Sequence, residues 1–407
     1  MSSPAERPLR LGVAGLGRAF TLMLPTFIGD PRVRLVAAAD PRAEARSRFE
    51  QDFSARTHGS VEALCDDPDV EAVYIATPHQ DHARHVEIAA ARGKHVLVEK
   101  PMAITLADCV RMVEAARKAN VRLIVGHSHS FNRPILRTRE IVKSGAVGQV
   151  RMITALNYTD FLYRPRRPEE LVTEQGGGVL FSQAAHQIDV VRLIGGGRVR
   201  SVRAVTGSWD AARPTEGAYS ALLTFENGAS ASVVYSGYGH FDSDELTGWI
   251  GELGQAKDPA GYGAARRALQ SAANAAEEAA LKNARNYGGS GYRAAAVGAS
   301  DPRMHQHFGF VVASCERADL RPLPTGVMIY GDTGARLDPL PAPEVPRAEV
   351  IDELYDAVVF DKRTVHSGEW ALATVEVCLA MLASARENKE VALRHQVSDE
   401  VDGAGST

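Results

Sequence analysis

The chain has 407 residues, about twice the length of a typical domain, and this length predicts two domains. Its 46 lysines and arginines against 50 aspartates and glutamates give a formal charge of −4, which argues against a nucleic-acid-binding surface. No uninterrupted apolar run approaches the roughly 20 residues of a membrane helix, and the polar segment 1–10 does not resemble a signal peptide. Four widely spaced cysteines predict neither a disulfide framework nor a zinc site. We therefore expect a soluble, cytoplasmic protein, with an enzyme as the first hypothesis.

The first third of the chain begins with the apolar run 10–15 (RLGVAG), which predicts a buried strand. This run ends in the glycine turn 15–17 (GLG), and a helical pattern over 21–28 and a second apolar run over 33–39 follow. Asp40 ends the second run. A strand, a glycine turn, a helix, a strand and an acid within about 30 residues are typical of a dinucleotide site. Glycines let backbone N–H groups approach a diphosphate, and the acid can accept hydrogen bonds from ribose hydroxyls.

The pattern departs from the dinucleotide fingerprint at its third glycine position, where Phe20 stands. We expect the helix to pack differently on its strand there. Asp40 favours NAD, because its charge would repel a 2′-phosphate, whereas Arg42 leaves NADP open. Asp40 could also be a plain turn residue before Pro41. The residues expected to form the first part of the cofactor site are Gly15, Gly17, Arg18, Ala19, Phe20, Asp40 and Arg42.

The alternation of strands and helices continues to residue 125 and predicts a parallel, doubly wound α/β sheet. The expected strands are 72–76, 95–98 and 122–125, and the expected helices are 82–91 and 104–119. Ligands bind at the carboxyl ends of the strands in such sheets. Residues at or just after two of these ends complete the expected cofactor site: Thr77, Pro78, His82, Glu99 and Lys100.

Three motifs carry a family resemblance. They are the run 93–101 (GKHVLVEKP), the run 76–78 (ATP) followed by His82, and the triplet 176–178 (GGG) followed by His186 and Asp189. In order and spacing they resemble the glucose-fructose oxidoreductase/inositol dehydrogenase/MocA (Gfo/Idh/MocA) family, over about residues 9–391. The resemblance implies a Rossmann domain followed by an α+β domain with an open, mostly antiparallel sheet. It also implies nicotinamide-dependent oxidation or reduction at a carbon bearing oxygen, and a homo-oligomer formed through one face of that sheet.

The second part of the chain contains consecutive strand patterns, which predict an antiparallel sheet. These patterns cover 149–157, 201–208, 218–225 and 230–237, and a turn at 226–228 joins the last two. An Ala- and Gly-rich insertion over 246–298 interrupts them, with an exposed helix expected over 264–284. The insertion could act as a lid, as an oligomer contact, or as a surface excursion without function.

These patterns give the expected domain organisation. We expect a Rossmann domain at 7–127, an α+β domain for substrate and oligomerisation at 128–395, and a disordered tail at 396–407. We also expect the proline-rich stretch 337–346 to cross the surface, and closing helices at 350–357 and 369–388.

The resemblance places acid–base chemistry after the glycine triplet, where the family has a DxxxH motif. Ser182 stands at the Asp position and His186 at the His position, so the acid–base pairing is altered in this chain. His186 is suited to accept a hydroxyl proton near neutral pH, although a buried structural histidine is the alternative. Lys100 could stabilise the reacting oxygen, act as the base, or pair with Glu99. Asp189, one helical turn beyond His186, could orient its imidazole or face solvent.

Three arginines stand just before the glycine triplet, in the run 163–167 (YRPRR). The resemblance places this loop near the substrate, and Arg164, Arg166 and Arg167 would suit vicinal carboxylates, because guanidinium groups bind carboxylates bidentately. A solvated basic loop is the alternative. Further candidate substrate residues are His127, His129, Ser182, His305 and His307. The HxH pairs lack an evident third ligand, so we expect no metal.

We predict an NAD-dependent dehydrogenase of an anionic small molecule. The stretches GLGRAFTLMLPTF, FSQAAHQIDVVRLIGG and HFGFVVASCERADLRP resemble the phthalate 4,5-dihydrodiol dehydrogenases of the family. The leading hypothesis is therefore oxidation of a cyclic cis-diol, phthalate 4,5-dihydrodiol, to 4,5-dihydroxyphthalate. Two alternatives stay open: a dehydrogenase of a sugar, inositol or glycoside, and a non-catalytic nicotinamide-binding sensor, which Ser182 in place of an acid allows.

Overall fold

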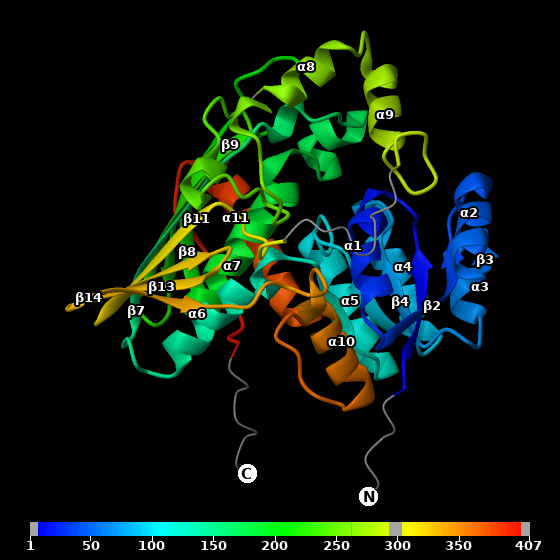
Figure 1. Cartoon of the computed structure of the whole chain (residues 1–407), viewed down its shortest axis with the longest axis horizontal. Helices are drawn as coiled ribbons and strands as arrows, with labels where there is room; N and C mark the ends of the chain where they lie inside the picture. Colours follow the sequence, from blue (N-terminus) through cyan, green and yellow to red (C-terminus); the bar gives the residue numbers. More distant parts are fainter. Residues whose placement is uncertain (1–6, 262, 293–302, 400–407) are drawn as a thin grey trace, which may run out of the picture. The chain divides into compact units, whose positions relative to one another are not determined.

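The computed structural model of the chain describes residues 7–261, 263–292 and 303–399 (Figure 1). Contacts within the chain divide these residues into two compact units. The first unit comprises the described parts of Met1–His127, Ala279–Ser300 and Glu344–Leu372, and the second those of Ser128–Glu278, Asp301–Pro343 and Ala373–Thr407.

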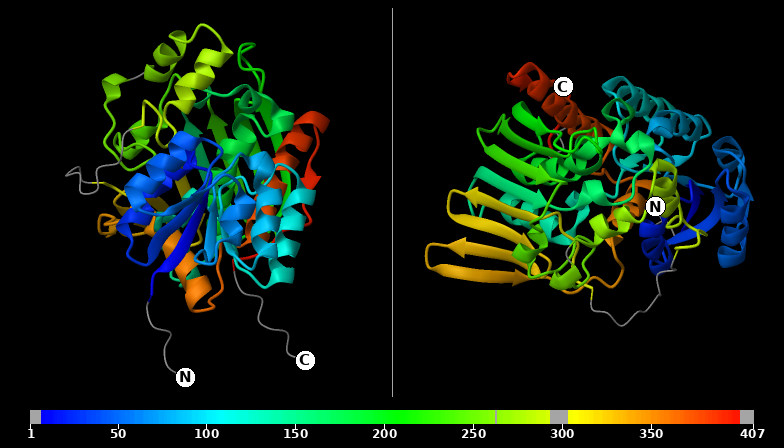
Figure 2. Two further views of the ribbon diagram at one scale, coloured as in Figure 1. Left: turned by 90° about the vertical axis from the view of Figure 1, so that its right-hand side faces the viewer. Right: turned by 90° about the horizontal axis from the view of Figure 1, so that it is seen from above.

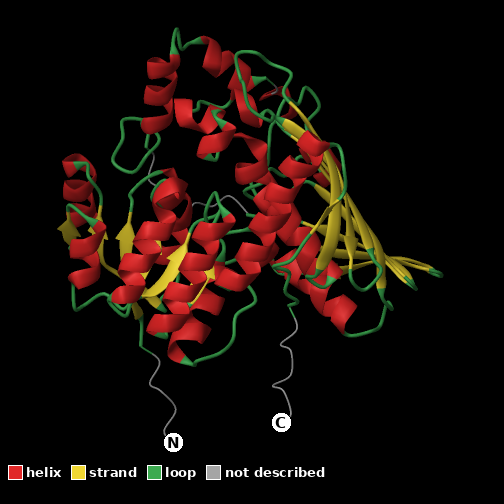
Figure 3. Ribbon diagram, turned by 180° about the vertical axis from the view of Figure 1, so that it is seen from behind, coloured by secondary structure: helices red, strands yellow, loops and turns green. Residues whose placement is uncertain are grey.

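The described part of the first unit contains a six-stranded parallel sheet in the order β3-β2-β1-β4-β5-β6. Figure 3 shows its strands in yellow with the helices in red beside them. The strand order reverses between β1 and β4, and ligands bind at such switch points. This arrangement confirms the predicted doubly wound sheet. The strands are β1 (Leu9–Ala14), β2 (Val33–Ala39), β3 (Arg56–His58), β4 (Ala72–Ile75), β5 (His95–Val98) and β6 (Leu123–Val125), and the helices between them are α1 (Arg18–Gly29), α2 (Ala43–Phe53), α3 (Val61–Asp66), α4 (His82–Ala91) and α5 (Leu106–Ala119).

The described part of the segment Ala279–Ser300, residues 279–292, packs in the first unit, although chain order predicts it in the second domain. Its Tyr287 is fully buried, and its ring meets that of Phe20 at 5.2 Å between centroids. The Tyr287 hydroxyl donates to Asp52 at 2.6 Å. Phe20, at the third glycine position of the fingerprint, also meets Phe49 at 6.0 Å. A segment that returns from far along the chain therefore accommodates the departure from the fingerprint.

The segment Glu344–Leu372 returns to the first unit as well, with helix α10 (Ala348–Val359). Asp352 of this helix pairs with Arg32 at 2.7 Å. The Tyr355 hydroxyl donates to the backbone carbonyl of residue 7 at 2.9 Å. These contacts join residues more than 300 positions apart, which a division by chain order does not foresee.

In the described part of the second unit, nine strands form one sheet in the order β14-β13-β12-β11-β7-β10-β9-β8-β15. All neighbours are antiparallel except β7 and β10, so the predicted mostly antiparallel sheet is confirmed. β9 and β10 form the predicted hairpin, where Gly228 has a φ of 85°. Strands β11 to β14 were not predicted: Arg and Pro interrupt β12 and β14, whereas the short apolar runs in β11 (FVVASC) and β13 (VMIY) were overlooked. The strands are β7 (Val150–Tyr158), β8 (Val199–Gly207), β9 (Ala218–Phe225), β10 (Ser230–Ser236), β11 (Phe310–Cys315), β12 (Ala318–Leu323), β13 (Gly326–Gly331), β14 (Gly334–Pro339) and β15 (Val391–Ala392).

The two faces of this sheet differ. Helices α6 (Arg133–Lys143) and α7 (Ala185–Gly195) pack on one face, and Figure 2 shows the other face without helices. Strand register places several exposed large apolar side chains together on the uncovered face: Met152, Val205, Leu222, Tyr330 and Leu337. We call these five residues the apolar sheet face. A patch of this kind is typical of an interaction surface.

The helix expected over 264–284 is two helices, α8 (Ala264–Gln270) and α9 (Ala275–Asn283). The Asn274 side chain accepts a hydrogen bond from the backbone N–H of Glu277 at 3.0 Å. This is the contact of a helix N-cap, so a new helix begins where propensity alone predicted a continuous one.

The tail predicted to be disordered is ordered over its first four residues, and the rest of it lies outside the described residues. Buried Arg192 donates to Gln396 Oε1 at 3.3 Å. The Asp399 carboxylate pairs with Arg139 at 2.6 Å and its side chain is only 1% exposed. The polar composition that suggested disorder therefore supplies partners to buried cations.

Helix α11 (Gly368–Glu387) is, among the described residues, long and apolar enough to cross a membrane, which the sequence reading did not anticipate. Of its most apolar window, 72% is buried inside the protein. Such burial is what the core helix of a folded domain shows.

His82 joins the loops that follow β4 and β5. Its side chain is buried. Nε2 lies 3.0 Å from the carbonyl oxygen of Thr77, which precedes the exposed Pro78 in the first loop. Nδ1 lies 3.1 Å from the carbonyl oxygen of Pro101 in the second loop. Burial lowers the pKa of His82 to about 4, so the ring is neutral at pH 7 and donates to one carbonyl at a time. His82 therefore holds together two loops that were predicted to meet the cofactor.

We predict that His82 makes the first unit acid-sensitive. Its pKa is lower folded than unfolded, so its stabilisation is present above about pH 6.5 and is lost as the pH falls toward 4. Lowering the pH from 7 to 5 should reduce the unfolding free energy of the native chain. In His82→Gln this reduction should be smaller by about 2 kcal/mol, because the variant has no imidazole to protonate. Urea denaturation at both pH values measures this, with His240→Gln, at an exposed histidine, as control. Equal pH dependence in both variants would contradict the assignment.

Candidate active site

The glycine turn after β1 has the backbone geometry that a bound diphosphate requires. Gly15 has a φ of 92°, and a Cβ on it would lie 2.8 Å from Ala76 O, so only glycine fits. A Cβ on Gly17 would meet nothing within 4 Å, so the turn is open on that side. Helix α1 begins at Arg18, where no side chain among the described residues caps its N-terminus, and its first turn contains no acidic residue. Its first N–H groups can therefore serve an anionic ligand.

Asp40 holds this turn from the end of β2, where it is buried. Its carboxylate accepts from Leu16 N at 2.8 Å, and from Arg42 N, Nε and Nη2 at 2.9 Å, 2.9 Å and 3.1 Å. Arg42 Nη2 also donates to Leu16 O at 2.8 Å. These donors match the roughly four lone-pair positions of a carboxylate. Asp40 and Arg42 thus shape the turn together, and a ribose hydroxyl would bond the carboxylate in place of one Arg42 donor.

These residues fit a dinucleotide. The turn and the start of α1 would hold its diphosphate, and Asp40 with Arg42 would meet the adenosine ribose. Arg18 is exposed at the start of the helix and Ala19 is half-buried. Phe20 is fully buried in the aromatic contact with Tyr287, so only its backbone can take part.

The ends of β4 and β5 carry the remaining predicted cofactor residues of the first unit. Thr77 Oγ1 lies 2.9 Å from His85 Nδ1. Glu99 accepts from the Tyr74 hydroxyl at 2.6 Å. Burial raises the pKa of Glu99, against the Tyr74 hydrogen bond and the charge of Lys100. Lys100 follows β5 directly and is half-buried at the carboxyl edge of the sheet.

In the second unit, His186 lies at the start of α7, after a π-helical turn (η6, Leu180–Ala184). Such turns occur frequently at functional sites. Ser182 within the turn donates to a backbone carbonyl one turn earlier at 2.5 Å. The His186 ring packs edge-on against the His129 ring, with 4.7 Å between centroids.

Two aromatic side chains extend this ring contact. Phe308 meets both His186 and His129 at 5.1 Å, and it stacks on Tyr235 at 6.1 Å. The Tyr235 hydroxyl bonds Thr159 Oγ1 at 2.8 Å. The rings therefore form a continuous apolar layer that includes two imidazoles.

Glu252 reaches the same place from the inserted segment. Its Oε1 lies 3.1 Å from His129 Nε2, and Asn132 Nδ2 lies 2.8 Å from His129 Nδ1. Because the Asn132 amide donates to Nδ1, Nε2 carries the proton and donates to Glu252. Burial alone would raise the pKa of Glu252, but the hydrogen bond from His129 and the charge of Arg164 lower it to about 2. The carboxylate is therefore ionised at neutral pH.

The three arginines of the 163–167 loop have different surroundings. Arg164 pairs with Asp160 at 3.1 Å, is 41% exposed, and acts electrostatically on Glu252 and Tyr235. Arg166 lies 3.6 Å over the ring of Phe161, and among the described residues its buried Nε has no hydrogen-bond partner.

Arg167, in contrast, pairs with Glu169 at 3.1 Å and with Glu170 at 3.6 Å on its own loop. The Tyr235 hydroxyl bonds Thr159, which stands just before the arginine loop, so Arg164 and Arg166 lie near the ring layer. Their charges oppose the effect of burial, which raises the pKa of Tyr235. We call the following residues the histidine–arginine cluster: His129, Arg164, Arg166, His186, Tyr235, Glu252 and Phe308.

The inserted segment also supports the arginine loop. The Arg266 guanidinium of α8 lies 3.9 Å over the Tyr163 ring. Glu278 of α9 accepts from Arg166 N at 2.7 Å and pairs with buried Arg213 at 2.8 Å. Within the second unit, the inserted segment thus packs against the arginine loop of the histidine–arginine cluster.

Three other predicted histidines are placed differently. His307 Nε2 donates to Ile250 O at 2.7 Å, and His305 Nε2 donates to Pro341 O at 2.8 Å. Both rings are buried and hold backbone segments. His127 is buried and belongs to the first unit.

Asp189 is buried and does not face solvent. Its carboxylate accepts from the Ser130 hydroxyl and from Thr374 Oγ1, the latter at 2.9 Å. Ser130 follows His129 directly, so Asp189 fixes the turn that carries His129.

Sequence reasoning missed Tyr235, Glu252 and Phe308. Tyr235 lies at a buried position of β10, which the strand alternation could have indicated, and Phe308 stands beside His307 in the HQHFG stretch. Glu252 lies in a glycine-rich stretch without a motif, so no sequence signal marks it. Within the described ranges, no group of three or more His, Cys, Asp or Glu side chains is placed to hold a metal ion.

Comparisons with known proteins agree with this geometry. Residues 9–127 match the model of an oxidoreductase family with an NAD-binding Rossmann fold, and residues 135–256 match the Gfo/Idh/MocA C-terminal domain. The chain is 52% identical over 378 residues to 1-carboxy-3-chloro-3,4-dihydroxycyclohexa-1,5-diene dehydrogenase of Comamonas testosteroni, covering 92% of this chain and 94% of that protein. It is 31% identical to dTDP-3,4-didehydro-2,6-dideoxy-alpha-D-glucose 3-reductase of Streptomyces violaceoruber, over 56% of this chain and 67% of that protein.

A solved structure is similar along its whole length. A protein of Bordetella bronchiseptica RB50 that has been assigned as a dehydrogenase superposes with a TM-score of 0.89 at 42% identity, covering 95% of this chain and 100% of that one. The glycine turn therefore belongs to an NAD-binding Rossmann fold and the nine-stranded sheet to the C-terminal domain that accompanies it. By these matches the chain belongs to the Gfo/Idh/MocA family and is an NAD(P)-dependent oxidoreductase.

Proposed function

We propose that this chain oxidises the cis-diol of a carboxylated cyclohexadiene to a catechol, with phthalate 4,5-cis-dihydrodiol as its substrate. The observation that carries the proposal is the histidine–arginine cluster, in which the rings around His186 are linked through Tyr235 and Thr159 to the loop of Arg164 and Arg166. The Comamonas relative supports it, because its name describes a cyclohexadiene with a carboxyl group and two hydroxyl groups.

The chemistry needs one hydride and one proton to leave the diol. NAD supplies, when bound, the acceptor for the hydride of one carbinol carbon. His186 is suited to take the hydroxyl proton of that carbon near neutral pH, and the Lys100 ammonium can stabilise negative charge on the oxygen. The hydroxyketone that forms becomes a catechol when the remaining carbinol carbon loses its hydrogen as a proton and the carbonyl oxygen gains a proton, so no second oxidant is required.

The arginines give the cluster its preference for an acid. Burial lowers the pKa of Arg166 to about 10, although the charge of Glu170 opposes this, so the guanidinium remains charged at neutral pH. A half-buried cation whose Nε has no hydrogen-bond partner among the described residues gains from an anionic partner. Buried Tyr235 and Phe308 stack on each other and support the rings of His129 and His186 from within the protein.

The choice of substrate can be tested by enzyme kinetics. With NAD, absorbance at 340 nm should rise with phthalate 4,5-cis-dihydrodiol, and much less with inositol, glucose or other sugars. Arg166→Gln should lower kcat/KM for the dihydrodiol about 10- to 100-fold, mainly through KM, because a charged hydrogen bond is lost. Arg167→Gln, at an arginine that its own loop neutralises, should change it less than about threefold.

Turnover of sugars at the rate of the dihydrodiol would favour the sugar alternative. Tight NAD binding without turnover of any diol would favour the sensor. Faster turnover of a monocarboxylated dihydrodiol would keep the reaction and replace phthalate as the substrate.

The roles of Lys100 and His186 in transferring the hydroxyl proton can be tested by substitution. Lys100→Met and His186→Asn should each lower kcat at least about 100-fold, the scale of a general acid–base group. NAD binding, followed by fluorescence of added NADH, should change little in His186→Asn, because His186 belongs to the second unit. A loss below about tenfold in kcat would remove that residue from the proton transfer.

We also propose that the apolar sheet face joins this chain to a second copy. Its five exposed apolar side chains come from five strands of one sheet, and burying such a patch stabilises an oligomer. Leu222→Glu should lower the mass measured by light scattering to that of a smaller species. Leu281→Glu, on helix α9, should leave it unchanged. A native chain that is already monomeric would contradict the proposal.

A further inference from the structure

We propose that Glu252 is a specificity-determining residue, whose carboxylate accepts hydrogen bonds from the hydroxyl groups of a cyclic diol. This inference rests on the proposed function and adds to it the group that recognises the diol. Four observations carry it: the anchoring of the segment, the ionised state of the carboxylate, an oxygen without a protein donor, and the arrangement of charges.

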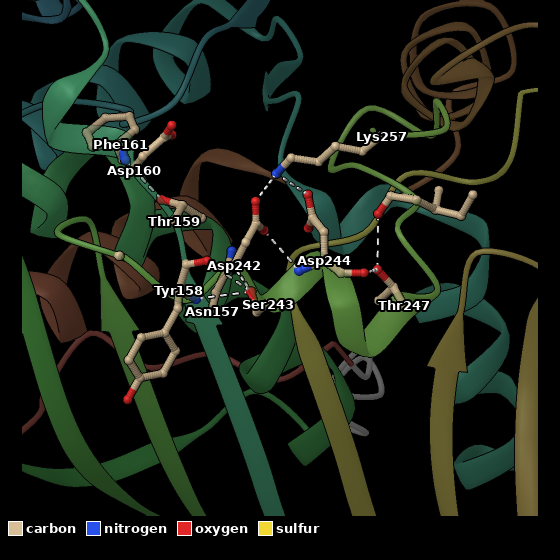
Figure 4. A network of polar contacts seen from close by, with 12 residues as sticks. Asn157, Tyr158, Thr159, Asp160, Phe161, Asp242, Ser243, Asp244, Thr247 and Lys257 are labelled. Carbon is tan, nitrogen blue, oxygen red and sulfur yellow. Dashed lines mark hydrogen bonds and ion pairs between the residues drawn. The ribbon is translucent and has the colours of Figure 1, made fainter. Parts of the chain in front are cut away.

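The segment 242–257, which carries Glu252, is attached to the end of β7 (Figure 4). Ser243 Oγ donates to Asn157 Oδ1 at 2.8 Å and accepts from Tyr158 N at 3.0 Å. Ser243 is fully buried, so these bonds are shielded from water. The first residues of the segment therefore have a fixed place on the sheet.

Further contacts close the segment on itself. Lys257 Nζ bridges Asp242 and Asp244, the latter at 3.0 Å, as Figure 4 shows. Thr247 Oγ1 donates to the carbonyl oxygen of Asp244 at 2.8 Å. His307 holds the carbonyl oxygen of Ile250, two residues before Glu252, at 2.7 Å. The backbone on both sides of Glu252 is thus anchored, and a side chain on an anchored loop is positioned for recognition.

The carboxylate of Glu252 has one bonded and one available oxygen. Oε1 accepts from His129, whereas no donor among the described residues bonds Oε2, and the side chain is 28% exposed. Because the pKa of Glu252 is lowered to about 2, against the effect of burial, the group stays an acceptor at neutral pH. A diol supplies the O–H donors that such an acceptor takes.

The charges of the cluster orient a substrate that has both an acid and a diol. Arg164 and Arg166 attract the ring carboxylates, and Glu252 repels them. The hydroxyl groups are then directed to Glu252, whose partner His129 lies against the ring of His186. The diol would therefore be presented to His186, the group proposed to take its proton.

The test compares ligands that differ by one hydroxyl group. The probes are two saturated cyclohexane dicarboxylates, one with a cis-diol and one with a single hydroxyl, measured as competitive inhibitors of dihydrodiol oxidation. In the native chain the diol should bind at least about 10-fold tighter, as a hydrogen bond to a charged group would give. In Glu252→Gln and Glu252→Asp this preference should fall below about threefold. Glu245→Gln, at an exposed glutamate of the same segment, should keep it.

Each outcome separates this inference from the proposed function. A native preference that persists in both Glu252 variants would overturn the inference and leave Glu252 as an anchor for His129. The thermal unfolding midpoint shows whether Glu252→Gln folds. If it does not fold, Glu252→Asp, which retains the charge, tests the inference by itself. A native chain that turns over no dihydrodiol but binds NAD would instead overturn the proposed function.

Discussion

Hydrogen bonds between buried imidazoles and main-chain carbonyl groups hold the loops of both units. His82 links the loops after β4 and β5, His305 holds the chain at Pro341, and His307 holds it at Ile250. A neutral imidazole is directional and carries no charge into the interior, so it can anchor a loop without the desolvation penalty of an ammonium or a carboxylate. The loops that carry the functional side chains depend on these anchors.

This interaction changes the meaning of the histidines in the sequence. His305 and His307, in the HQHFG stretch, were predicted as substrate residues, and the structure engages the Nε2 of each with a backbone carbonyl. His129 and His186 instead meet each other and Phe308. Residue type and spacing do not distinguish a histidine that anchors a loop from one that faces a substrate, because the difference lies in contacts between distant segments.

Local patterns did predict most of the framework. The strands Val33–Ala39 and His95–Val98 and the hairpin around Gly228 follow from apolar runs and a turn signal, which act within a few residues. The remainder depends on the chain returning to itself. Tyr287 packs on Phe20, and Glu252 bonds His129, across separations of more than 100 residues that no local pattern encodes. The inserted segment therefore contributes to both units, to the aromatic packing of one and to the candidate substrate site of the other.

In the proposed reaction a ring carbinol carbon of the substrate loses a hydride to the nicotinamide. A cis-dihydrodiol deuterated at both carbinol carbons tests it directly, with the NADH product analysed by mass spectrometry. Each NADH formed should carry one deuterium, and a catechol should be the second product. NADH without deuterium, or a catechol formed without NADH, would contradict it.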